Sequence, residues 1–238
     1  MIFKKNLLSV NIGGIGDDRM EINLLTLAFT GKDKNLEYAF TQRYSRHFLL
    51  QIRLALILGI IFYALFGILD AVVASQFTPE FWFIRFGLVC PITFLIFLAS
   101  FTKPLIKHIQ LAIAIVIFIG GLGIIYMSAV GNNFVSRTYY AGIILVLIFA
   151  YMFIRARFII ASSTCTLLIV LHLTFTIHTG KLPLLLMANN FFFLITANLM
   201  GMFVCYLMEY HARQDFFIRK LFQKRELSRP LPHPYPLE

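Results

Sequence analysis

Few residues of this sequence have the types and spacing that catalysis requires. The segment GGIGDD at residues 13–18 has the composition of a phosphate-binding loop, but a strand and a helix must frame such a loop, and the sequence predicts neither here. We therefore interpret it as a flexible turn. The apolar segments contain no HExxH motif, no paired aspartates and no Ser and His arrangement. An intramembrane enzyme accordingly ranks last among the function classes, and no catalytic residue is assigned.

The residues with the clearest binding chemistry are Asp70 and Arg85, which lie at the ends of two consecutive apolar segments. Ionisable residues at membrane depth are costly and are functional candidates by default. One interpretation pairs them as the polar floor of an outward-facing pocket for a small lipophilic ligand. The alternative, a structural ion pair beside ordinary interfacial anchors, is slightly favoured because such anchors are common at this depth. Further pocket candidates at the other outer ends are Arg137, Tyr139, Tyr140, His178, Asn189 and Asn190.

The remaining polar residues of the apolar segments do not indicate a cofactor. His172 and His178 are six residues apart, which places them on different faces of one helix and disfavours a haem or metal site. We interpret His172 as a hydrogen-bonded residue of the helix bundle. Asn198 can bond to a neighbouring helix or to a second copy of the chain. The three cysteines form no CxxC pair and are interpreted as packing residues: Cys90, Cys165 and Cys205.

The composition explains why these polar residues are so few. The chain has 238 residues, of which 59% are hydrophobic and 13% are charged, and this balance indicates a polytopic membrane protein. An apolar stretch of about 20 residues crosses the hydrocarbon layer. Six stretches qualify, and the short loops between them favour a compact all-α bundle. The predicted spans are Leu54–Ala74, Phe83–Phe101, Ile109–Met127, Tyr140–Phe153, Ile159–Ile177 and Leu186–Met208.

The basic residues predict the orientation of the bundle. If both termini are cytoplasmic, all 21 Lys and Arg residues lie on the cytoplasmic side except Arg85, Arg137 and Lys181. This distribution follows the positive-inside rule and predicts a multi-pass membrane protein with both termini cytoplasmic. The net charge of +10 is then explained by topology and by anionic lipid. Nucleic acid is not expected as a partner.

Residues 36–53 form a predicted amphipathic helix before the first span. Leu36, Phe40, Tyr44 and Phe48 recur every four residues, with basic residues on the other faces. This pattern is typical of a helix at the cytoplasmic membrane surface with its aromatic rings among the lipid headgroups. A plain extension of the first span, packed on the bundle, fits the pattern equally well.

The last span continues into residues 209–227 without Gly or Pro. Its apolar residues alternate between steps of four and three, which is the spacing of a coiled coil and predicts a homodimer. An exposed helix end that only satisfies the charge rule is the alternative. The predicted seam comprises Phe203, Leu207, Tyr210, Gln214, Phe217, Leu221 and Lys224.

The segments outside these helices complete the predicted organisation. Residues 1–35 are a cytoplasmic N-terminal segment, 36–53 the amphipathic helix, 54–208 the membrane domain, and 209–227 a cytoplasmic transducing helix. Residues 228–238 have Pro at every second place from 230 to 236, which excludes a helix. The terminal Leu-Glu is typical of a cloning junction.

Two blocks of the sequence resemble a known family. They are LEYAFTQRYSRHFLLQIRLALILGIIFYALFGILD and NNFFFLITANLMGMFVCYLMEYHARQDFFIRKLFQKRE. The resemblance is to the six-helix N-terminal membrane domain of bacterial class III adenylate cyclases, and it covers about residues 36–227. Similar domains precede diguanylate cyclases and histidine kinases. The resemblance implies that residues 209–227 transmit a signal to a C-terminal cytoplasmic catalytic domain, whose metal-binding aspartates have no counterpart after Leu227.

We therefore expect a sensor and anchor domain that converts an outer-side or membrane-borne signal into helix motion. A transporter or channel is the alternative class. That class is characterised by inverted repeats, interrupted spans and charges at the bilayer midplane, none of which is evident. Gly120, Gly121 and Gly123 are the nearest thing to an interruption, and close helix packing explains them equally well.

Overall fold

The structure, a computed structural model, describes residues 7–10 and 20–227. It confirms the expected all-α membrane bundle, because the described residues contain six helical segments long and apolar enough to span a membrane. The internal contacts divide the chain into two compact units. We call residues 41–207 the membrane unit, and residues 1–40 with 208–238 the terminal unit. The predicted turn at 13–18 and the Pro-rich tail at 228–238 lie outside the described residues.

The first two spans differ from the sequence prediction in their boundaries. The backbone leaves helical geometry at Phe48, with φ −94° and ψ 8°, so the amphipathic helix ends before residue 53 and the first span begins at Leu49. The second span begins with a short 3₁₀ turn and contains a wide π-helical turn. The elements are α1 (Leu36–His47), α2 (Leu49–Val73), η2 (Ser75–Phe77), α3 (Thr78–Trp82), η3 (Phe83–Val89) and α4 (Cys90–Ala99).

The fourth span is longer than predicted. It extends back to Asn133, because the side chain of Asn132 caps the helix by accepting a hydrogen bond from the backbone N–H of Val135. The fourth span therefore has 21 residues, which is long enough to cross a membrane. The later elements are α5 (Lys103–Val130), α6 (Asn133–Thr138), α7 (Tyr140–Ile148), η4 (Phe149–Phe153), α8 (Phe158–Thr179) and α9 (Leu184–Leu227).

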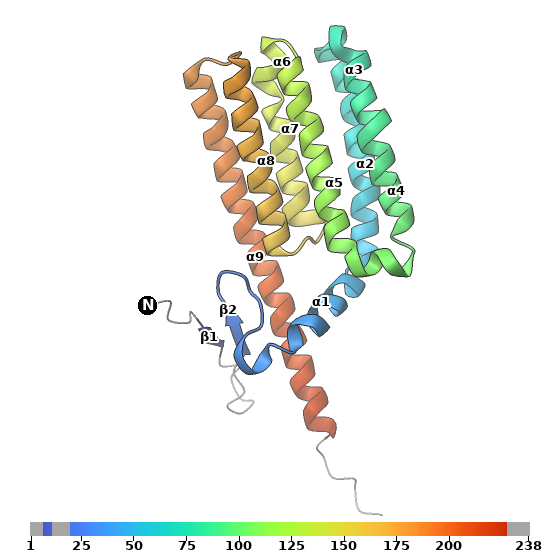
Figure 1. The fold of residues 1–238 in the computed structure, drawn as a ribbon, viewed down its shortest axis with the longest axis vertical. Coiled ribbons are helices and arrows are strands. Elements are labelled where there is room, and N and C mark those ends of the chain that lie inside the picture. Colours follow the sequence, from blue (N-terminus) through green and yellow to red (C-terminus); the bar gives the residue numbers. More distant parts are fainter. Residues whose placement is uncertain (1–6, 11–19, 228–238) are drawn as a thin grey trace, which may run out of the picture. The chain divides into compact units, whose positions relative to one another are not determined.

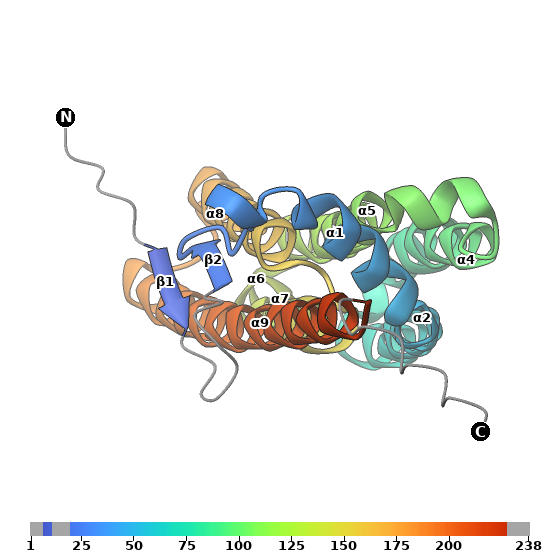
Figure 2. The same ribbon diagram turned by 90° about the horizontal axis from the view of Figure 1, so that it is seen from below.

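The helices of the membrane unit stand side by side in two rows (Figures 1 and 2). One row contains α4, α5 and α8, and the other contains α2, α7 and the membrane part of α9. The central helix α5 has the largest buried share of the six spans. It continues through Gly121, where an added Cβ would lie 2.5 Å from a methyl carbon of Leu168. Gly121 therefore serves close packing, and the glycines at 120, 121 and 123 do not interrupt the helix.

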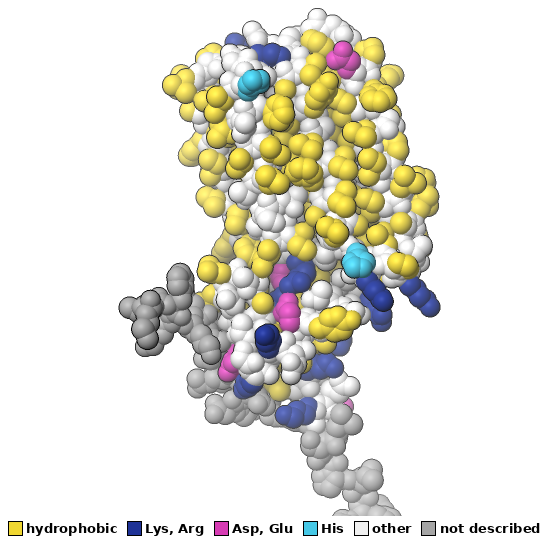
Figure 3. Space-filling model, in the orientation of Figure 1, with side chains coloured by type: hydrophobic (Ala, Val, Ile, Leu, Met, Phe, Trp, Pro, Cys, Tyr) yellow, Lys and Arg dark blue, Asp and Glu magenta, His cyan; other side chains and the backbone are white. Residues whose placement is uncertain are grey.

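The outer faces of the membrane unit are apolar. Large hydrophobic side chains are exposed along every span, including Leu65 on α2, Leu95 on α4 and Leu199 on α9, and they cover much of the surface drawn in Figure 3. Such continuous apolar exposure is unusual for a monomer in water. It fits a surface in contact with lipid.

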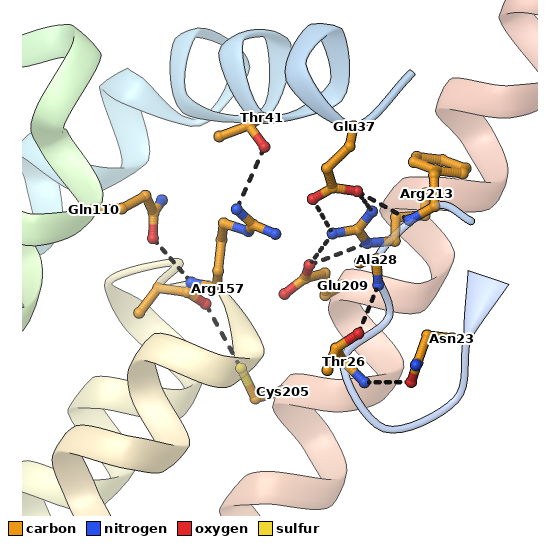
Figure 4. Close-up of polar contacts among 12 residues, drawn as sticks. Asn23, Thr26, Ala28, Glu37, Thr41, Gln110, Arg157, Cys205, Glu209 and Arg213 are labelled. Carbon is orange, nitrogen blue, oxygen red and sulfur yellow. Dashed lines mark hydrogen bonds and ion pairs between the residues drawn. The ribbon is translucent and has the colours of Figure 1, made fainter. Parts of the chain in front are cut away.

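At the end of the bundle opposite Asp70, arginines form hydrogen bonds between its elements. Arg53 donates to the hydroxyl and the carbonyl oxygen of Ser100, at 3.1 and 2.8 Å, and its guanidinium lies 3.9 Å from the ring centre of Phe101. Arg157 donates to the hydroxyl of Thr41, and its backbone N–H donates to Gln110 (Figure 4). These contacts join α1, α2, α4, α5 and the loop before α8.

The terminal unit contains a short hairpin that the sequence did not predict. Strand β1 (Leu7–Val10) pairs with β2 (Met20–Asn23) in antiparallel register, and a 3₁₀ turn, η1 (Gly31–Asp33), follows. Asp33 accepts a hydrogen bond from the backbone N–H of Glu21. Met20, Ile22 and Phe29 are buried, so this segment has a small apolar core of its own.

Candidate functional site: a polar-ended cavity in the membrane unit

A cavity of about 610 Å³ lies between α2, η3, α4, α5, α6, α7 and η4. This volume is in the range of small-molecule sites, which are mostly apolar with a few converging polar groups. Its polar lining includes Tyr63, Asp70, Arg85, Cys90, Thr93, Thr138 and Tyr139.

The polar groups at one end of the cavity form a buried network. Two nitrogens of Arg85 donate to the two carboxylate oxygens of Asp70, at 2.5 and 3.0 Å. The hydroxyl of Tyr139 donates to the same carboxylate at 2.7 Å. Asp70 and Arg85 are 1% and 4% exposed. The pairing predicted from the antiparallel arrangement of the first two spans is thus confirmed, and its charges are largely removed from solvent.

Aromatic rings surround the guanidinium of Arg85. Its carbon lies 4.9 Å from the ring centre of Tyr63 and 5.9 Å from that of Phe66, within the range of cation–π attraction. A further nitrogen donates to the backbone carbonyl of Tyr63 at 3.3 Å. Tyr63 in turn donates its hydroxyl to the carbonyl of Gly120. Arg85 therefore contacts α2 both through hydrogen bonds and through aromatic rings.

The rest of the cavity is apolar and long. Its lining on α2 runs from Leu58 to Val73, a distance of about 22 Å at the helical rise of about 1.5 Å per residue. Phe62 on α2 and Leu145 and Ile148 on α7 line the cavity and are also exposed. The cavity is therefore bordered at these residues by the apolar outer surface of the membrane unit.

Two π-helical segments in the described part of the chain contribute to this lining. Arg85 and Val89 come from η3, and Phe149 and Phe153 come from η4. The wide turn of η3 has a local cause. Pro91, the second residue of α4, has no N–H, and its ring clashes with the carbonyl four residues earlier, inside η3. The backbone N–H of Cys90 bonds instead to the carbonyl of Arg85. Single π turns inside helices occur frequently at functional sites.

The structure brings together only part of the predicted pocket. Asp70, Arg85 and Tyr139 meet, whereas Arg137, His178 and Asn189 are exposed, Tyr140 is half-buried and Asn190 is buried. None of these last five lines the cavity. Sequence reasoning missed Tyr63, Thr93 and the phenylalanines of the walls. Tyr63 had a detectable signal, since it lies two helical turns before Asp70 on the same face.

A second buried polar contact joins the fourth span to the last. Tyr151 donates its hydroxyl to the side-chain oxygen of Asn198 at 2.7 Å, and Asn198 donates weakly to the hydroxyl of Thr166. An added Cβ at Gly201 would lie 2.2 Å from the Tyr151 ring. The Asn-Leu-Met-Gly passage thus provides both the partner and the space for Tyr151. The expectation that Asn198 bonds to a neighbouring helix is confirmed.

His172 is buried and packs against an aromatic ring. Its ring centre lies 5.4 Å from that of Phe191. Among the residues that the structure describes, no group of three or more His, Cys, Asp or Glu side chains is placed to hold a metal ion.

The terminal unit holds a separate cluster around Arg213 (Figure 4). Arg213, on the extension of α9, is fully buried. It donates to both carboxylate oxygens of Glu37 at 2.7 and 3.1 Å, and to one oxygen of Glu209 at 3.0 and 2.7 Å. Glu37 also accepts from the backbone N–H of Phe29 at 3.0 Å. The start of α1 and the segment before it are therefore bonded to the extension of α9.

Aromatic rings enclose this ion cluster. Phe29, Phe40 and Phe216 pack in mutual contact, with ring centres 5.6 to 6.2 Å apart. The guanidinium of Arg213 lies 4.2 Å from the ring centre of Phe40 and 5.1 Å from that of Phe29. Phe40 is thus buried in protein rather than exposed to headgroups, and so is Tyr44. This corrects the interfacial interpretation of residues 36–53 at these two positions.

The predicted seam of α9 has an uneven environment. Phe203 and Leu207 are exposed, Tyr210, Gln214 and Leu221 are half-buried, and Lys224 is exposed. Gln214 donates to the hydroxyl of Tyr210 at 3.1 Å. Phe217 is only 3% exposed, so it is already covered within its own chain. Glu209, Arg213 and Phe216, spaced by four and three, form the face that the terminal unit buries.

Comparisons with known proteins place the chain in a family. Residues 68–223 match MASE8, a family of membrane-associated sensor domains. The match begins near the end of α2, includes Asp70 and Arg85, and extends through the Arg213 cluster on α9. Searches of curated proteins and of solved structures found no match. Since the matched range covers more than half of the sequence and the six apolar helices fit such a domain, the chain belongs to the MASE8 family of membrane sensor domains.

Proposed function

We propose that this membrane sensor domain belongs to a bacterial adenylate cyclase. It dimerises and transmits a membrane-borne or outer-side signal to a C-terminal cytoplasmic catalytic domain. The inner membrane, with both termini cytoplasmic, is the proposed location. The support comes from the family, from the resemblance of residues 36–227 to cyclase membrane domains, and from the distribution of Lys and Arg. Diguanylate cyclase and histidine kinase outputs are the alternatives.

The observation that carries the proposal is the continuity of α9. This helix runs for 44 residues from Leu184 to Leu227. It contains Asn198 and Gly201, which contact the fourth span, and also Arg213, whose side chain is fixed by Glu37. A helix without a break resists bending, so a rotation or shift of its membrane part reaches the last residues.

The polar-ended cavity is the proposed signal site. It combines a volume suited to a small molecule, mostly apolar walls and directed polar groups. A small lipophilic ligand that binds there would contact α2, η3 and α7 at once. A change in their separation could then be passed to α9 through η4, since Phe149 and Phe153 line the cavity and Tyr151 bonds to Asn198.

Dimerisation can be tested by disulfide cross-linking in membranes. Single cysteines at Leu207, Gln214 and Leu221 are introduced after Cys90, Cys165 and Cys205 are replaced by Ala. Phe217 is unsuitable because it is buried. We expect cross-linked dimers at these seam positions and far less at Arg219, which is exposed on another face of the same helix. Monomers at every seam position would overturn the dimer.

The identity of the catalytic domain can be tested by reading the native coding sequence. We expect the native coding sequence to continue after residue 227 into a class III cyclase domain. A diguanylate cyclase or kinase domain in that place would establish one of the alternative outputs.

A further inference from the structure

The hydrogen-bonding capacity at the polar end of the cavity is incompletely used. A guanidinium has five N–H donors. Arg85 gives two to Asp70 and one to the carbonyl of Tyr63. The hydroxyl of Tyr139 also interacts with the guanidinium, and no other acceptor among the described residues takes the remaining donors. Because Arg85 is 4% exposed and lines the cavity, a molecule inside the cavity can accept from them.

The charge at this end is already balanced. Asp70 neutralises Arg85, and Tyr139 contributes a neutral hydroxyl that is donated to Asp70. An anionic headgroup would bring a second negative charge next to Asp70 in a medium of low dielectric constant, where like charges repel strongly. A cationic headgroup would meet the guanidinium. The site therefore favours a neutral oxygen that accepts hydrogen bonds.

The walls of the cavity determine the length and polarity of the rest of the ligand. Their lining on α2 extends over about 22 Å, which is most of a hydrocarbon layer of about 30 Å, and it is apolar apart from Tyr63 and Asp70. Exposed lining residues on α2 and α7 border the cavity at the apolar outer surface of the membrane unit. An extended alkyl chain that enters sideways from the membrane matches this shape.

We propose that the cavity binds a neutral, membrane-borne lipophile, with its ester, ketone or alcohol oxygen accepting from Arg85 and its alkyl chain along α2. This inference rests on the proposed sensing role and names the chemical class of the signal. The cavity should bind neutral lipids in preference to fatty acids and lipid amines of the same length.

The test is photo-labelling of the full chain in nanodiscs. The probes are a 16-carbon methyl ester and the corresponding fatty acid, each with a diazirine at the same carbon. Peptides from α2 and α7 are analysed by mass spectrometry. We expect the ester to label these peptides several-fold more than the acid, with competition by unlabelled methyl ester. The exposed lipid-facing surface of α9 should be labelled equally by both probes.

Two variants test the site. Arg85→Lys keeps the charge and removes the spare planar donors, so the preference for the ester should disappear. Leu145→Trp fills the cavity without altering the ion pair and should abolish labelling of the lining. Leu199→Trp, on an exposed position of α9 outside the cavity, is the matched control and should have no effect.

The outcomes separate this inference from the sensing role. Equal labelling by ester and acid, unchanged in Arg85→Lys, would overturn the neutral-acceptor ligand and leave a lipophile-binding sensor. Labelling of the lining that survives Leu145→Trp, or no labelling of the lining by either probe, would overturn the cavity as the binding site. Signal transmission through α9 is judged independently, by cross-linking and by the helix-phase experiment below.

Discussion

Burial of the charges of Asp70 and Arg85 inside a membrane protein costs free energy. Removing two charges from water costs several kcal/mol per ion, and their attraction repays this only with good geometry and further hydrogen bonds. Here both carboxylate oxygens are used, Tyr139 adds a third donor, and two aromatic rings cover the guanidinium. An apolar pair of similar volume would often be as stable. The hydrogen bonds and ring contacts of the pair therefore offset part of the cost of removing its charges from water.

Breaking this pair on one side should be far more harmful than replacing both partners. Asp70→Leu leaves the buried guanidinium without its counter-charge and should destabilise the membrane unit by about 3–5 kcal/mol. Asp70→Leu combined with Arg85→Met should recover most of this loss. Thermal unfolding in detergent, followed by near-ultraviolet circular dichroism, gives both values. A double variant as unstable as the single one would show that Arg85 has another structural role.

Gly201 should be intolerant of a methyl group. In Gly201→Ala the new Cβ would lie 2.2 Å from the Tyr151 ring. The ring must move away from Asn198, and overpacking of this kind costs about 1–3 kcal/mol. Gly120→Ala is the matched control, because its nearest contact would be 3.9 Å and alanine favours a helix. Equal unfolding temperatures for the two variants would contradict the role given to Gly201.

At the scale of elements, the cluster around Arg213 attaches the N-terminal segment to the extension of α9. Arg213→Ala leaves Glu209, which is 2% exposed, buried without its partner, and the loss should be on the order of 3 kcal/mol. We expect residues 20–40 to exchange amide hydrogens much faster, as measured by mass spectrometry. Arg219→Ala, at an exposed site on the same helix, should leave exchange unchanged. Unaltered exchange in Arg213→Ala would mean that the aromatic contacts alone hold the segment.

The elements also show what sequence reasoning can and cannot reach. Hydropathy located all six spans because a membrane helix must be apolar over its whole length. Boundaries were less accurate, since the cap at Asn132 and the break at Phe48 depend on local geometry. The burial of Phe216 and Phe217 was not predicted, because an amphipathic pattern does not reveal which surface covers it. The hairpin β1 and β2 had no strong pattern at all.

At the scale of the whole molecule, the sequence predicted the ion pair of the site and offered a pocket beside it as one interpretation, but it did not predict most of the side chains that line the cavity. Consecutive antiparallel spans bring Asp70 and Arg85 together, and this follows from topology alone. Tyr139 and the phenylalanines of η4 reach the same cavity from the fourth span, which depends on how α2 packs against α4 and η4 and how α7 packs against α5. A cavity is the volume that side chains leave unfilled, so it depends on the complete packing arrangement.

Rotation of α9 should decide the activity of a catalytic domain fused after Leu227. In this experiment, a class III cyclase reporter follows Leu227 with inserts of one to seven alanines. Each inserted residue turns the reporter by about 100° and moves it by about 1.5 Å. If α9 transmits rotation through a dimer, cyclase activity should follow the helical phase. Inserts of four and seven residues should resemble the uninterrupted fusion, whereas two and five should differ by several-fold.

Two controls define the result of the phase experiment. A flexible Gly-Ser insert of seven residues interrupts the helix and should uncouple the reporter, although its length equals that of the in-phase alanine insert. Arg213→Ala with no insert should alter activity without changing the phase. A steady decline with insert length, without recovery at seven residues, would contradict transmission by a rigid helix and would favour a simple tether between membrane and catalytic domain.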